Sequence, residues 1–470
     1  MKRTLAGLSL LLLLSGAKKP AAPPPPPPVG VTAARSGAAE VVRAVLPGLL
    51  AGVELPRGAD GKLDVVLLLR AAPKEDDHER WNPSEESTDE GPPGARSLQL
   101  LDLTGSLLRS LLPEVQTGTL GALDLDGDGA EEILLATKGE LRSLGSASRP
   151  SERTILDLSA TDLRFPSRWR DQQITGVLAS GVGTVRLYLP NGGGLAPSVE
   201  RELPSRASRE RWGIRLTSPR VRSVRGDGDL LAAGPEAEGR QRLRSLLIGA
   251  ESTTEVWSLL PGPEEVDTAW YVKIGGRPSL IVTTHSADKI GIFESKKLRV
   301  FPLTADRTRA GRRPLLATQT TSHRWLPVAP LVTDLDRDGK DDLVVLQHDG
   351  MGGGEIVAET FFGRGDGRFE TPGRRQKWDL QTRDFHYGHD LTGDGIADLA
   401  VVEPRRLVVY PGTKEPRKAL LERKPLEVPL NLAEEAGIRG LRVADLDGDG
   451  RAEAVLTGSA GTGRDVVMVA

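Results

Sequence analysis

The chain has 470 residues, with 62 Lys and Arg against 65 Asp and Glu, so its formal net charge is only −3. Such a near-neutral chain has no bulk attraction for nucleic acid or an acidic membrane, and we expect neither as a partner. It contains no cysteine, which excludes disulfide bonds, thiol catalysis and cysteine-based zinc sites. A bound metal ion is then the available way to cross-link parts of the folded chain.

The first 17 residues are typical of an export signal. Lys2 and Arg3 form a basic start, and residues 5–14 form an apolar run too short to span a bilayer as a mature helix. Residues 18–30 are rich in proline, which predicts a stiff polyproline II linker. We therefore predict a bacterial protein exported to the periplasm, the cell surface or the medium. It would have no transmembrane segment once the signal is removed.

Four short acidic loops are the most informative feature of the remaining chain. Each places oxygen-bearing side chains at positions 1, 3, 5 and 9 and a glycine at position 6. In chain order, as loops one to four, these side chains are Asp124, Asp126, Asp128 and Glu132; Asp334, Asp336, Asp338 and Asp342; Asp390, Thr392, Asp394 and Asp398; and Asp445, Asp447, Asp449 and Glu453.

This arrangement of oxygens suits a hard divalent cation. Ca²⁺ takes six to eight oxygen ligands at about 2.3–2.6 Å, and alternating carboxylates on a tight turn can supply them. Without a cation, the converging carboxylates would repel one another. Because no counter-charged side chain is built into the four-acid pattern, we expect Ca²⁺ to stabilise the folded chain.

An EF-hand is excluded as the setting of these loops. That site needs a bidentate Glu at position 12 and a helix on either side. Position 12 is instead Leu135, Val345, Val401 or Leu456, and short apolar runs flank each loop. The acid at position 9 replaces the missing ligand. We therefore predict cation sites of the strand–loop–strand type.

Weaker copies of the same unit extend along the chain. The first keeps Asp60, Gly61 and Asp64 at positions 5, 6 and 9 but lacks acids at positions 1 and 3. Several short strands per unit, broken by turn residues, indicate four-stranded propeller blades. Residues 36–50 are an exception that predicts a short helix, and the polar residues 71–95 are predicted to form a loop inserted in the first blade. The eight units centre near residues 64, 132, 180, 230, 280, 342, 398 and 453.

The acidic loops followed by apolar strands resemble the FG-GAP/VCBS repeat family, best known from the integrin α propeller. Residues 361–369, followed by Pro372, are similar to the F-x-G-x-G-D-G-x-F stretch found downstream of the cation loop in such repeats. The resemblance implies an all-β fold over residues 31–470, a β-propeller of seven or eight four-stranded blades with Ca²⁺ in several of its loops. The family favours seven blades, in which case the first and last units combine into one closed blade.

The resemblance also implies a further ligand in each loop, the backbone carbonyl at position 7. These residues are Ala130, Lys340, Ile396 and Arg451. Loop three departs from the pattern because Thr392 stands at position 3, where a hydroxyl brings no charge. We therefore expect it to be the weakest of the sites.

The sequence offers little for catalysis, and no catalytic residue is predicted. It lacks the motifs of zinc proteases, serine hydrolases and nucleotide-binding loops. His386 and His389 are three residues apart, a spacing that places side chains on opposite faces of a strand. We therefore predict that they do not share a transition-metal site.

Three functions remain open from the sequence. The first is an exported, non-catalytic, calcium-stabilised propeller that acts as a binding, adhesion or scaffold module for a protein or glycan ligand on a loop face. The second is a polysaccharide-active enzyme on a similar propeller, and the third is a purely structural envelope protein. We favour the first, as a monomer, although a fold does not by itself give a function.

Overall fold

The computed structural model describes residues 30–470 with the following gaps: 37–38, 72–95, 103–106, 116–118, 138–139, 158–161, 165–176, 182–183, 203–219, 223–226, 236–240, 249–252, 286–294, 306–307, 324–327, 350–354, 379–384, 404, 433–435 and 462–463. The predicted signal peptide, linker and inserted loop lie outside the described residues, except for Gly30 and Ala71, which belong to strands.

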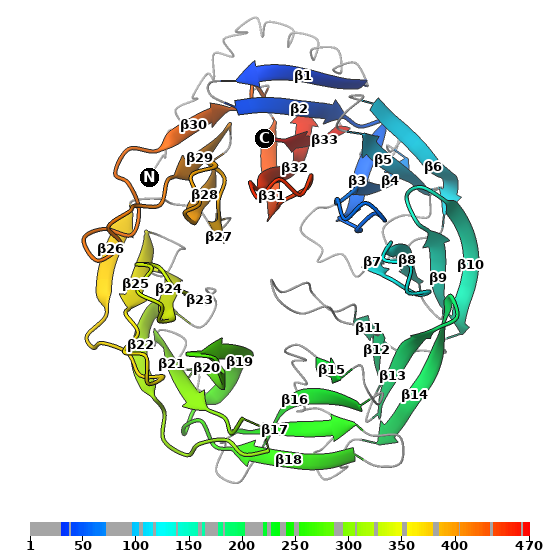
Figure 1. Ribbon diagram of the computed structural model, residues 1–470. Coiled ribbons are helices and arrows are strands. Elements are labelled where there is room, and N and C mark those ends of the chain that lie inside the picture. Colours follow the sequence, from blue (N-terminus) through cyan, green and yellow to red (C-terminus); the bar gives the residue numbers. More distant parts are fainter. Residues whose placement is uncertain are drawn as a thin grey trace, which may run out of the picture.

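Every regular element in the described part of the chain is a β-strand, which confirms the all-β prediction. The strands form eight antiparallel sheets, seven of four strands and one of five. The sheets stand around a common centre like the blades of a propeller (Figure 1). Each of the eight units expected from the sequence centres at or beside the second strand of one sheet.

The first four sheets contain, in chain order, β3 (Gly48–Glu54), β4 (Val65–Ala71), β5 (Arg96–Asp102) and β6 (Leu107–Val115); β7 (Thr119–Leu123), β8 (Glu132–Thr137), β9 (Glu140–Gly145) and β10 (Pro150–Asp157); β11 (Asp162–Arg164), β12 (Val177–Gly181), β13 (Thr184–Asn191) and β14 (Gly194–Glu202); and β15 (Arg220–Arg222), β16 (Asp227–Pro235), β17 (Gln241–Ile248) and β18 (Thr253–Leu259).

The other four sheets contain β19 (Glu265–Ile274), β20 (Arg277–His285), β21 (Ser295–Pro302) and β22 (Leu316–His323); β23 (Val328–Thr333), β24 (Asp342–His348), β25 (Ile356–Phe361) and β26 (Arg374–Trp378); β27 (Phe385–His389), β28 (Asp398–Glu403), β29 (Arg406–Tyr410) and β30 (Leu426–Pro429); and β31 (Gly437–Ala444), β32 (Glu453–Gly461) and β33 (Arg464–Val469), joined by β1 (Gly30–Ser36) and β2 (Ala39–Val45).

The N-terminal strands close the ring. β2 pairs with β33 in antiparallel register, from Val42 opposite Val469 to Val45 opposite Val466. The first unit keeps a complete sheet of its own, β3 to β6. The segment that precedes it, and not the first unit itself, therefore completes the last blade.

The prediction of a helix over residues 36–50 is wrong. This stretch contributes β2 and the start of β3. Val41 and Val45 pack into one hydrophobic cluster, whereas Ala44 packs into the neighbouring cluster. Because the segment buries side chains on both of its faces and pairs with β33, the sheet overrides the local preference of its Ala, Glu and Leu residues for helix.

The hydrophobic core lies between neighbouring blades. Leu346 of β24 and Val401 of β28 share one cluster, and Val345 of β24 shares another with Ile281 of β20. β24 and β28 are therefore buried on both faces, and each contains a continuous apolar run.

Among the described residues, no helix is long and apolar enough to cross a membrane.

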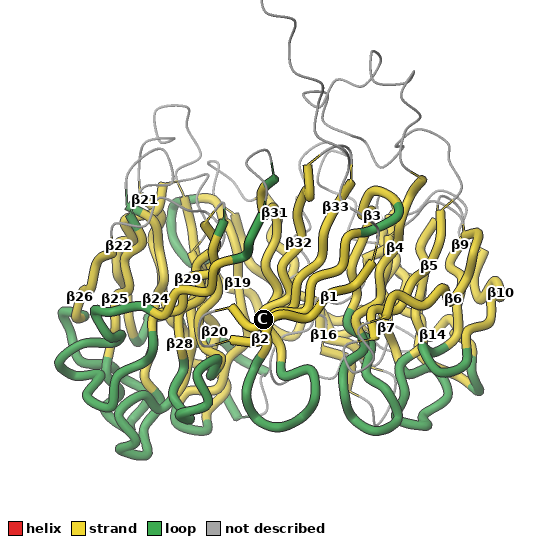
Figure 2. Tube along the Cα trace, turned by 90° about the horizontal axis from the view of Figure 1, so that it is seen from above, coloured by secondary structure: helices red, strands yellow, loops and turns green. Residues whose placement is uncertain are grey.

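The acidic loops lie on one face of the ring. Each joins the first strand of a sheet to the second, and the blades share one orientation around the centre, so the loops emerge together. The view from the side shows described loops gathered along this face (Figure 2).

Candidate metal centres

Four hairpins present the acidic loops, so each loop joins two strands, as the sequence predicts, and the bound cation stays a prediction. The loops join β7 to β8, β23 to β24, β27 to β28 and β31 to β32. In each hairpin the acid at position 9 lies directly opposite the residue that precedes position 1. These opposing pairs are Leu123 and Glu132, Thr333 and Asp342, His389 and Asp398, and Ala444 and Glu453.

The same hydrogen bonds recur in all four loops. The carboxylate at position 1 accepts the backbone N–H of position 6, with N–O distances of 3.1 Å for Asp124 and Gly129, 3.0 Å for Asp334 and Gly339, 2.6 Å for Asp390 and Gly395, and 3.0 Å for Asp445 and Gly450. The carboxylate at position 5 accepts the N–H of position 7, at 2.8 Å for Asp128 and Ala130, 3.0 Å for Asp338 and Lys340, 2.9 Å for Asp394 and Ile396, and 2.7 Å for Asp449 and Arg451.

Two backbone positions in each loop adopt a left-handed conformation. Position 6 is always glycine, as the pattern required, with φ between 80° and 90°. Position 4 also has positive φ and is glycine in three loops, but it is Arg337 in loop two, at φ 59°. The second left-handed position was not anticipated, although the glycines at position 4 could have indicated it.

The acid at position 9 is anchored beneath the turn. In every loop its carboxylate accepts the N–H of position 2, at 2.7 Å for Leu125 and Glu132, 3.0 Å for Leu335 and Asp342, 2.8 Å for Leu391 and Asp398, and 2.8 Å for Leu446 and Glu453. Asp342 and Asp398 are fully buried, and each accepts a further N–H from the glycine after the third strand, Gly363 at 2.7 Å and Gly412 at 2.9 Å. Asp398 also accepts the N–H of Thr392 at 2.9 Å. A Cβ at Gly363 would lie 2.2 Å from a backbone oxygen, so the glycine after the third strand makes this contact possible.

Burial leaves these anchored acids short of compensating charge. It raises the pKa of all four, Glu132, Asp342, Asp398 and Glu453, above the usual range, although backbone hydrogen bonds oppose the shift. For Asp342 the pKa rises to about 6, and the nearby Asp336 and Asp338 add to the effect. A divalent cation would supply the charge that these carboxylates lack.

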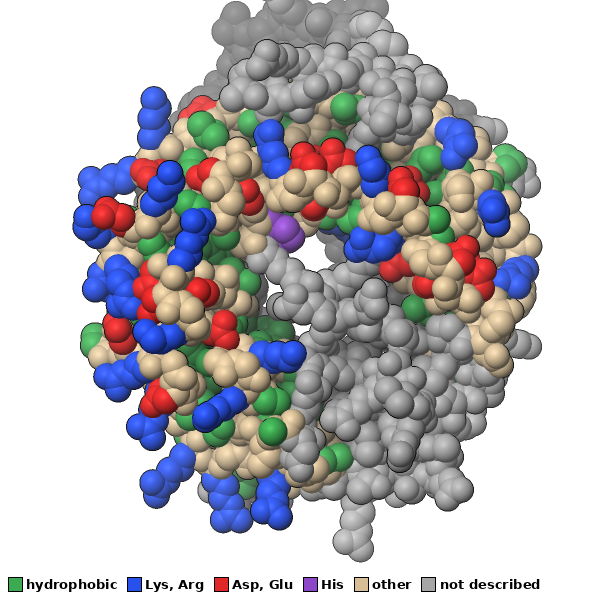
Figure 3. Space-filling model, viewed as in Figure 1, with side chains coloured by type: hydrophobic (Ala, Val, Ile, Leu, Met, Phe, Trp, Pro, Cys, Tyr) green, Lys and Arg blue, Asp and Glu red, His purple; other side chains and the backbone are tan. Residues whose placement is uncertain are grey.

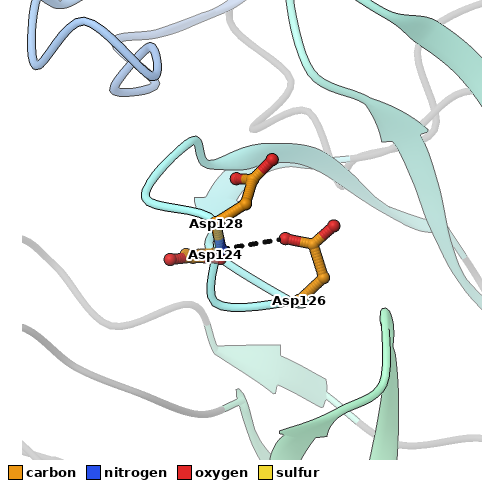
Figure 4. A group of neighbouring side chains, drawn as sticks. All are labelled: Asp124, Asp126 and Asp128. Carbon is orange, nitrogen blue, oxygen red and sulfur yellow. Dashed lines mark hydrogen bonds between the residues drawn. The ribbon is translucent and has the colours of Figure 1, made fainter.

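Three of the loops bring acidic side chains together closely enough for a shared ion. In each group, one carboxylate oxygen from every member lies within 4.8 Å of the others. The groups are Asp124, Asp126 and Asp128; Asp334, Asp336 and Asp342; and Asp445, Asp447 and Glu453. Figure 4 shows the first group around its turn, with the N–H of Asp128 donating to Asp126 at 3.1 Å.

Loop three forms no such group among the described residues. The Thr392 hydroxyl donates to Asp390 at 3.4 Å and brings no charge of its own. In all four loops, position 7 contributes its N–H to position 5, as described above. Its carbonyl remains a predicted ligand.

In loop two, positively charged side chains already contact the acids, contrary to the expectation from the sequence. Arg417, from the β29–β30 connection of the next blade, donates its Nε to Asp336. The Lys340 Nζ lies 2.6 Å from Asp338 and lowers the pKa of that carboxyl. Arg417 also contacts Glu370 at 3.2 Å and lies 4.3 Å from the centre of the Phe362 ring.

The donor set of the loops fits Ca²⁺. It consists of carboxylates and one hydroxyl, with backbone carbonyls within the same turns, and hard cations prefer such oxygens. Position 1 and position 9 are held by backbone N–H groups before any ion arrives. Carboxylate oxygens can therefore converge on an ion without rebuilding the turn.

Backbone hydrogen bonds connect some of these loops to turns in adjacent blades. The N–H of Ala452 in loop four donates to the carbonyl of Asp390 in loop three at 2.7 Å. Leu63, in the weak first unit, donates to the carbonyl of Leu446 at 2.8 Å, and Glu131 of loop one donates to Arg57 at 2.7 Å. Order in one loop is thus linked to the position of the next blade.

The prediction that His386 and His389 lie on opposite faces is wrong. The pairing of β27 with β28 shifts register between Tyr387 and His389, and Gly388 there has φ 108°. This β-bulge adds one residue and brings both imidazoles to one side. Their rings stack with centroids 4.6 Å apart.

The FG-GAP-like repeat family model matches residues 390–456, which contain loops three and four. No curated protein matches the chain.

Solved structures match only distantly. The WD40 domain of SCAP from fission yeast is 11% identical, with 91% of this chain and 96% of that chain covered and a TM-score of 0.46. The Nup133 β-propeller domain of Vanderwaltozyma polyspora is 12% identical, with 71% and 90% covered and a TM-score of 0.39. The endo-arabinase of Bacteroides thetaiotaomicron is 15% identical, with 55% and 90% covered and a TM-score of 0.30. Likenesses this weak support no inference about function.

Proposed function

The chain is an FG-GAP repeat β-propeller, and from this premise we propose that it is an exported, calcium-stabilised binding module. The observation that carries the proposal is the hydrogen-bond scheme repeated in four acidic loops. Cation sites built from one repeat would share these hydrogen bonds to the acids at positions 1, 5 and 9, whereas unrelated solvated turns need not share them.

Calcium in this proposal acts on stability. An ion that binds only the folded chain stabilises it by about 1.4 kcal/mol per site when present at tenfold excess over Kd. Extracellular Ca²⁺ modules commonly have Kd values of about 10⁻⁴–10⁻³ M, so 1 mM Ca²⁺ would occupy about half to nine tenths of such sites. The ion would hold the loop face in one arrangement.

The ligand would bind on this face. Acidic side chains gather there in patches, with Lys and Arg side chains beside them (Figure 3). A pocket of about 350 Å³ lies between loops two and three, and Asp336, Asp390, Arg337 and Lys414 line part of it. Its mixed charges and hydrogen-bonding groups suit a polar ligand such as a sugar or a peptide segment.

The calcium part of the proposal is tested by thermal unfolding in EGTA, in millimolar Ca²⁺ and in millimolar Mg²⁺. We expect Ca²⁺ alone to raise the unfolding temperature by several degrees. The double variant Asp445→Asn with Asp447→Asn should lose part of this rise, and Asp366→Asn, an exposed acid outside the loops, should keep it. An equal rise with Mg²⁺, or none with Ca²⁺, would contradict the proposal.

The binding part is tested with a panel of purified neutral and acidic polysaccharides and of peptides, each measured in Ca²⁺ and in EGTA. We expect at least one ligand to bind in Ca²⁺ and to lose affinity when Lys414→Ala alters the pocket. Release of sugar or peptide products during the assay would instead support the enzyme alternative.

A further inference from the structure

The bulge in β27 creates a pair of converging imidazoles. The Nε2 atom of His386 and the Nδ1 atom of His389 lie 2.5 Å apart, and the two ring planes differ by 30°. Two imidazole nitrogens this close can share a proton as a hydrogen bond, and a small separation would let both bind one metal ion. We propose that His386 and His389 form a binding site for a transition-metal ion such as Cu²⁺, Ni²⁺ or Zn²⁺.

The geometry requires little change to hold such an ion. Metal–imidazole distances of about 2.0–2.1 Å and ligand angles near those of a tetrahedron or square place two nitrogens about 2.8–3.4 Å apart. His386 and His389 need to separate by only about 0.3–0.9 Å to reach that spacing.

The backbone fixes both rings on the same side of the blade. His386 lies opposite Ala400 and His389 lies opposite Asp398 in the β27–β28 pairing. Ala400 belongs to the cluster packed against β31, whereas Tyr387 packs toward β24. The imidazoles therefore share the side that faces the β31 blade, where both are half-buried.

The chemistry of this pair differs from that of the acidic loops. Imidazole nitrogen favours copper, nickel and zinc, whereas carboxylate and carbonyl oxygens favour calcium and magnesium. The two kinds of site would therefore prefer different ions. Two protein ligands also leave coordination positions for water or for a donor group of a bound ligand, as in exchangeable rather than closed structural sites.

β27 is the innermost strand of its blade and borders the centre of the ring (Figure 1). Gly388 of the bulge also lines the pocket between loops two and three. His389 is followed directly by Asp390, so an ion on the histidine pair would lie beside loop three. The pair therefore differs from two exposed histidines on a surface, because both rings are half-buried at the end of a blade strand.

The test is isothermal titration of the full chain, prepared without a polyhistidine tag and kept in saturating Ca²⁺, with Cu²⁺, Ni²⁺ or Zn²⁺. We expect one equivalent to bind, and His386→Gln or His389→Gln each to weaken it at least about tenfold, the lower end of the loss seen when partners of metal ligands are removed. His78→Gln, which removes a histidine elsewhere, should bind like the original chain. Unchanged affinity in both His386→Gln and His389→Gln would overturn the proposal.

A second measurement needs no substitution. Diethyl pyrocarbonate modifies accessible imidazoles, and peptide mass spectrometry locates the modified residues. Zn²⁺ should lower the modification of His386 and His389 and leave that of the other histidines unchanged, and equal modification of the pair with and without Zn²⁺ would overturn the proposal. Because Ca²⁺ loads the oxygen sites, a failure of the calcium proposal would appear in the unfolding experiment and not here.

Discussion

Position 6 of each acidic loop needs glycine because its backbone is left-handed, and not because a side chain there would clash with a neighbour. Gly450 has φ 90°, yet a Cβ built on it would meet nothing within 4 Å. Gly437, at the start of β31, also has open space around it, and its φ is not in the left-handed region. The two glycines therefore separate conformational strain from crowding.

We predict that Gly450→Ala destabilises the chain by about 1–2 kcal/mol, the cost of a left-handed conformation for a residue with a Cβ. Gly437→Ala should be neutral or slightly stabilising, because it restricts only the unfolded chain. Urea unfolding in saturating Ca²⁺ measures both. Equal effects of the two substitutions would show that position 6 does not need glycine.

Arg417 distinguishes loop two from the other loops. Its guanidinium contacts Asp336, so it competes with a cation for that carboxylate. We predict that Arg417→Ala lowers stability in EGTA by up to about 1 kcal/mol, as expected for a partly exposed ion pair. The rise in unfolding temperature on adding Ca²⁺ should then be larger than in the original chain.

The matched control is Lys418→Ala, because the neighbouring Lys418 side chain is 75% exposed and pairs with Glu415. Its calcium response should equal that of the original chain. If Arg417→Ala also leaves the response unchanged, then Arg417 and the ion do not share Asp336.

The residues of the loops could be predicted from sequence because each loop is local. Acids at alternating positions and a glycine at position 6 act within nine residues, and the turn keeps them together. Arg417 could not be predicted, since it lies in the next blade and reaches Asp336 only through the fold. The pairing of His386 with His389 was missed because one extra residue in a strand reverses the side on which every later side chain lies.

A buried ion pair forms within the sheet of β19 to β22. Lys296 of β21 donates to Asp267 of β19 at 2.9 Å, and both side chains are at most 10% exposed. Asp267 lies at a register shift between β19 and β20, which lets its carboxylate reach across the sheet. The Thr283 hydroxyl donates to the same carboxylate at 3.2 Å.

We predict that Asp267→Asn costs about 3–5 kcal/mol, because it leaves the Lys296 ammonium buried without its charge partner. The double variant Asp267→Leu with Lys296→Met should be less destabilised than Asp267→Asn, because it removes both charges at similar volume. Urea unfolding of the two variants makes the comparison. A double variant at least as unstable as the single one would show that the ion pair itself is stabilising.

The strands themselves were predictable wherever an apolar run follows a turn signal, as at residues 343–345 and 399–402. The segment 36–50 was not, because its Ala, Glu and Leu residues suit a helix and its strand partner lies in the last blade. Local preference thus fails where the pairing strand is remote in sequence.

At the scale of the whole molecule, β2 holds the ring closed. Val41, Val45 and Leu46 are buried, and each contributes about 1.5–3 kcal/mol by leaving water. Their sum is comparable with the whole stability of a typical domain, about 5–15 kcal/mol.

We predict that a chain lacking residues 1–46 loses cooperative unfolding in urea and elutes as an expanded species in gel filtration. A chain lacking only residues 1–29 keeps every described strand and should unfold like the full chain. Matching urea midpoints for the two truncated chains would show that the ring does not depend on β2.

The pairing of Val42 with Val469 also sets the order in which the molecule can be completed during synthesis. β2 leaves the ribosome early, yet its partner β33 emerges only after every other blade has been made. In the meantime β2 presents an unpaired strand edge, which can associate with other chains. Joining such distant segments carries a large entropic cost and is slow, so chaperones that shield strand edges would have their greatest effect on this chain during that interval.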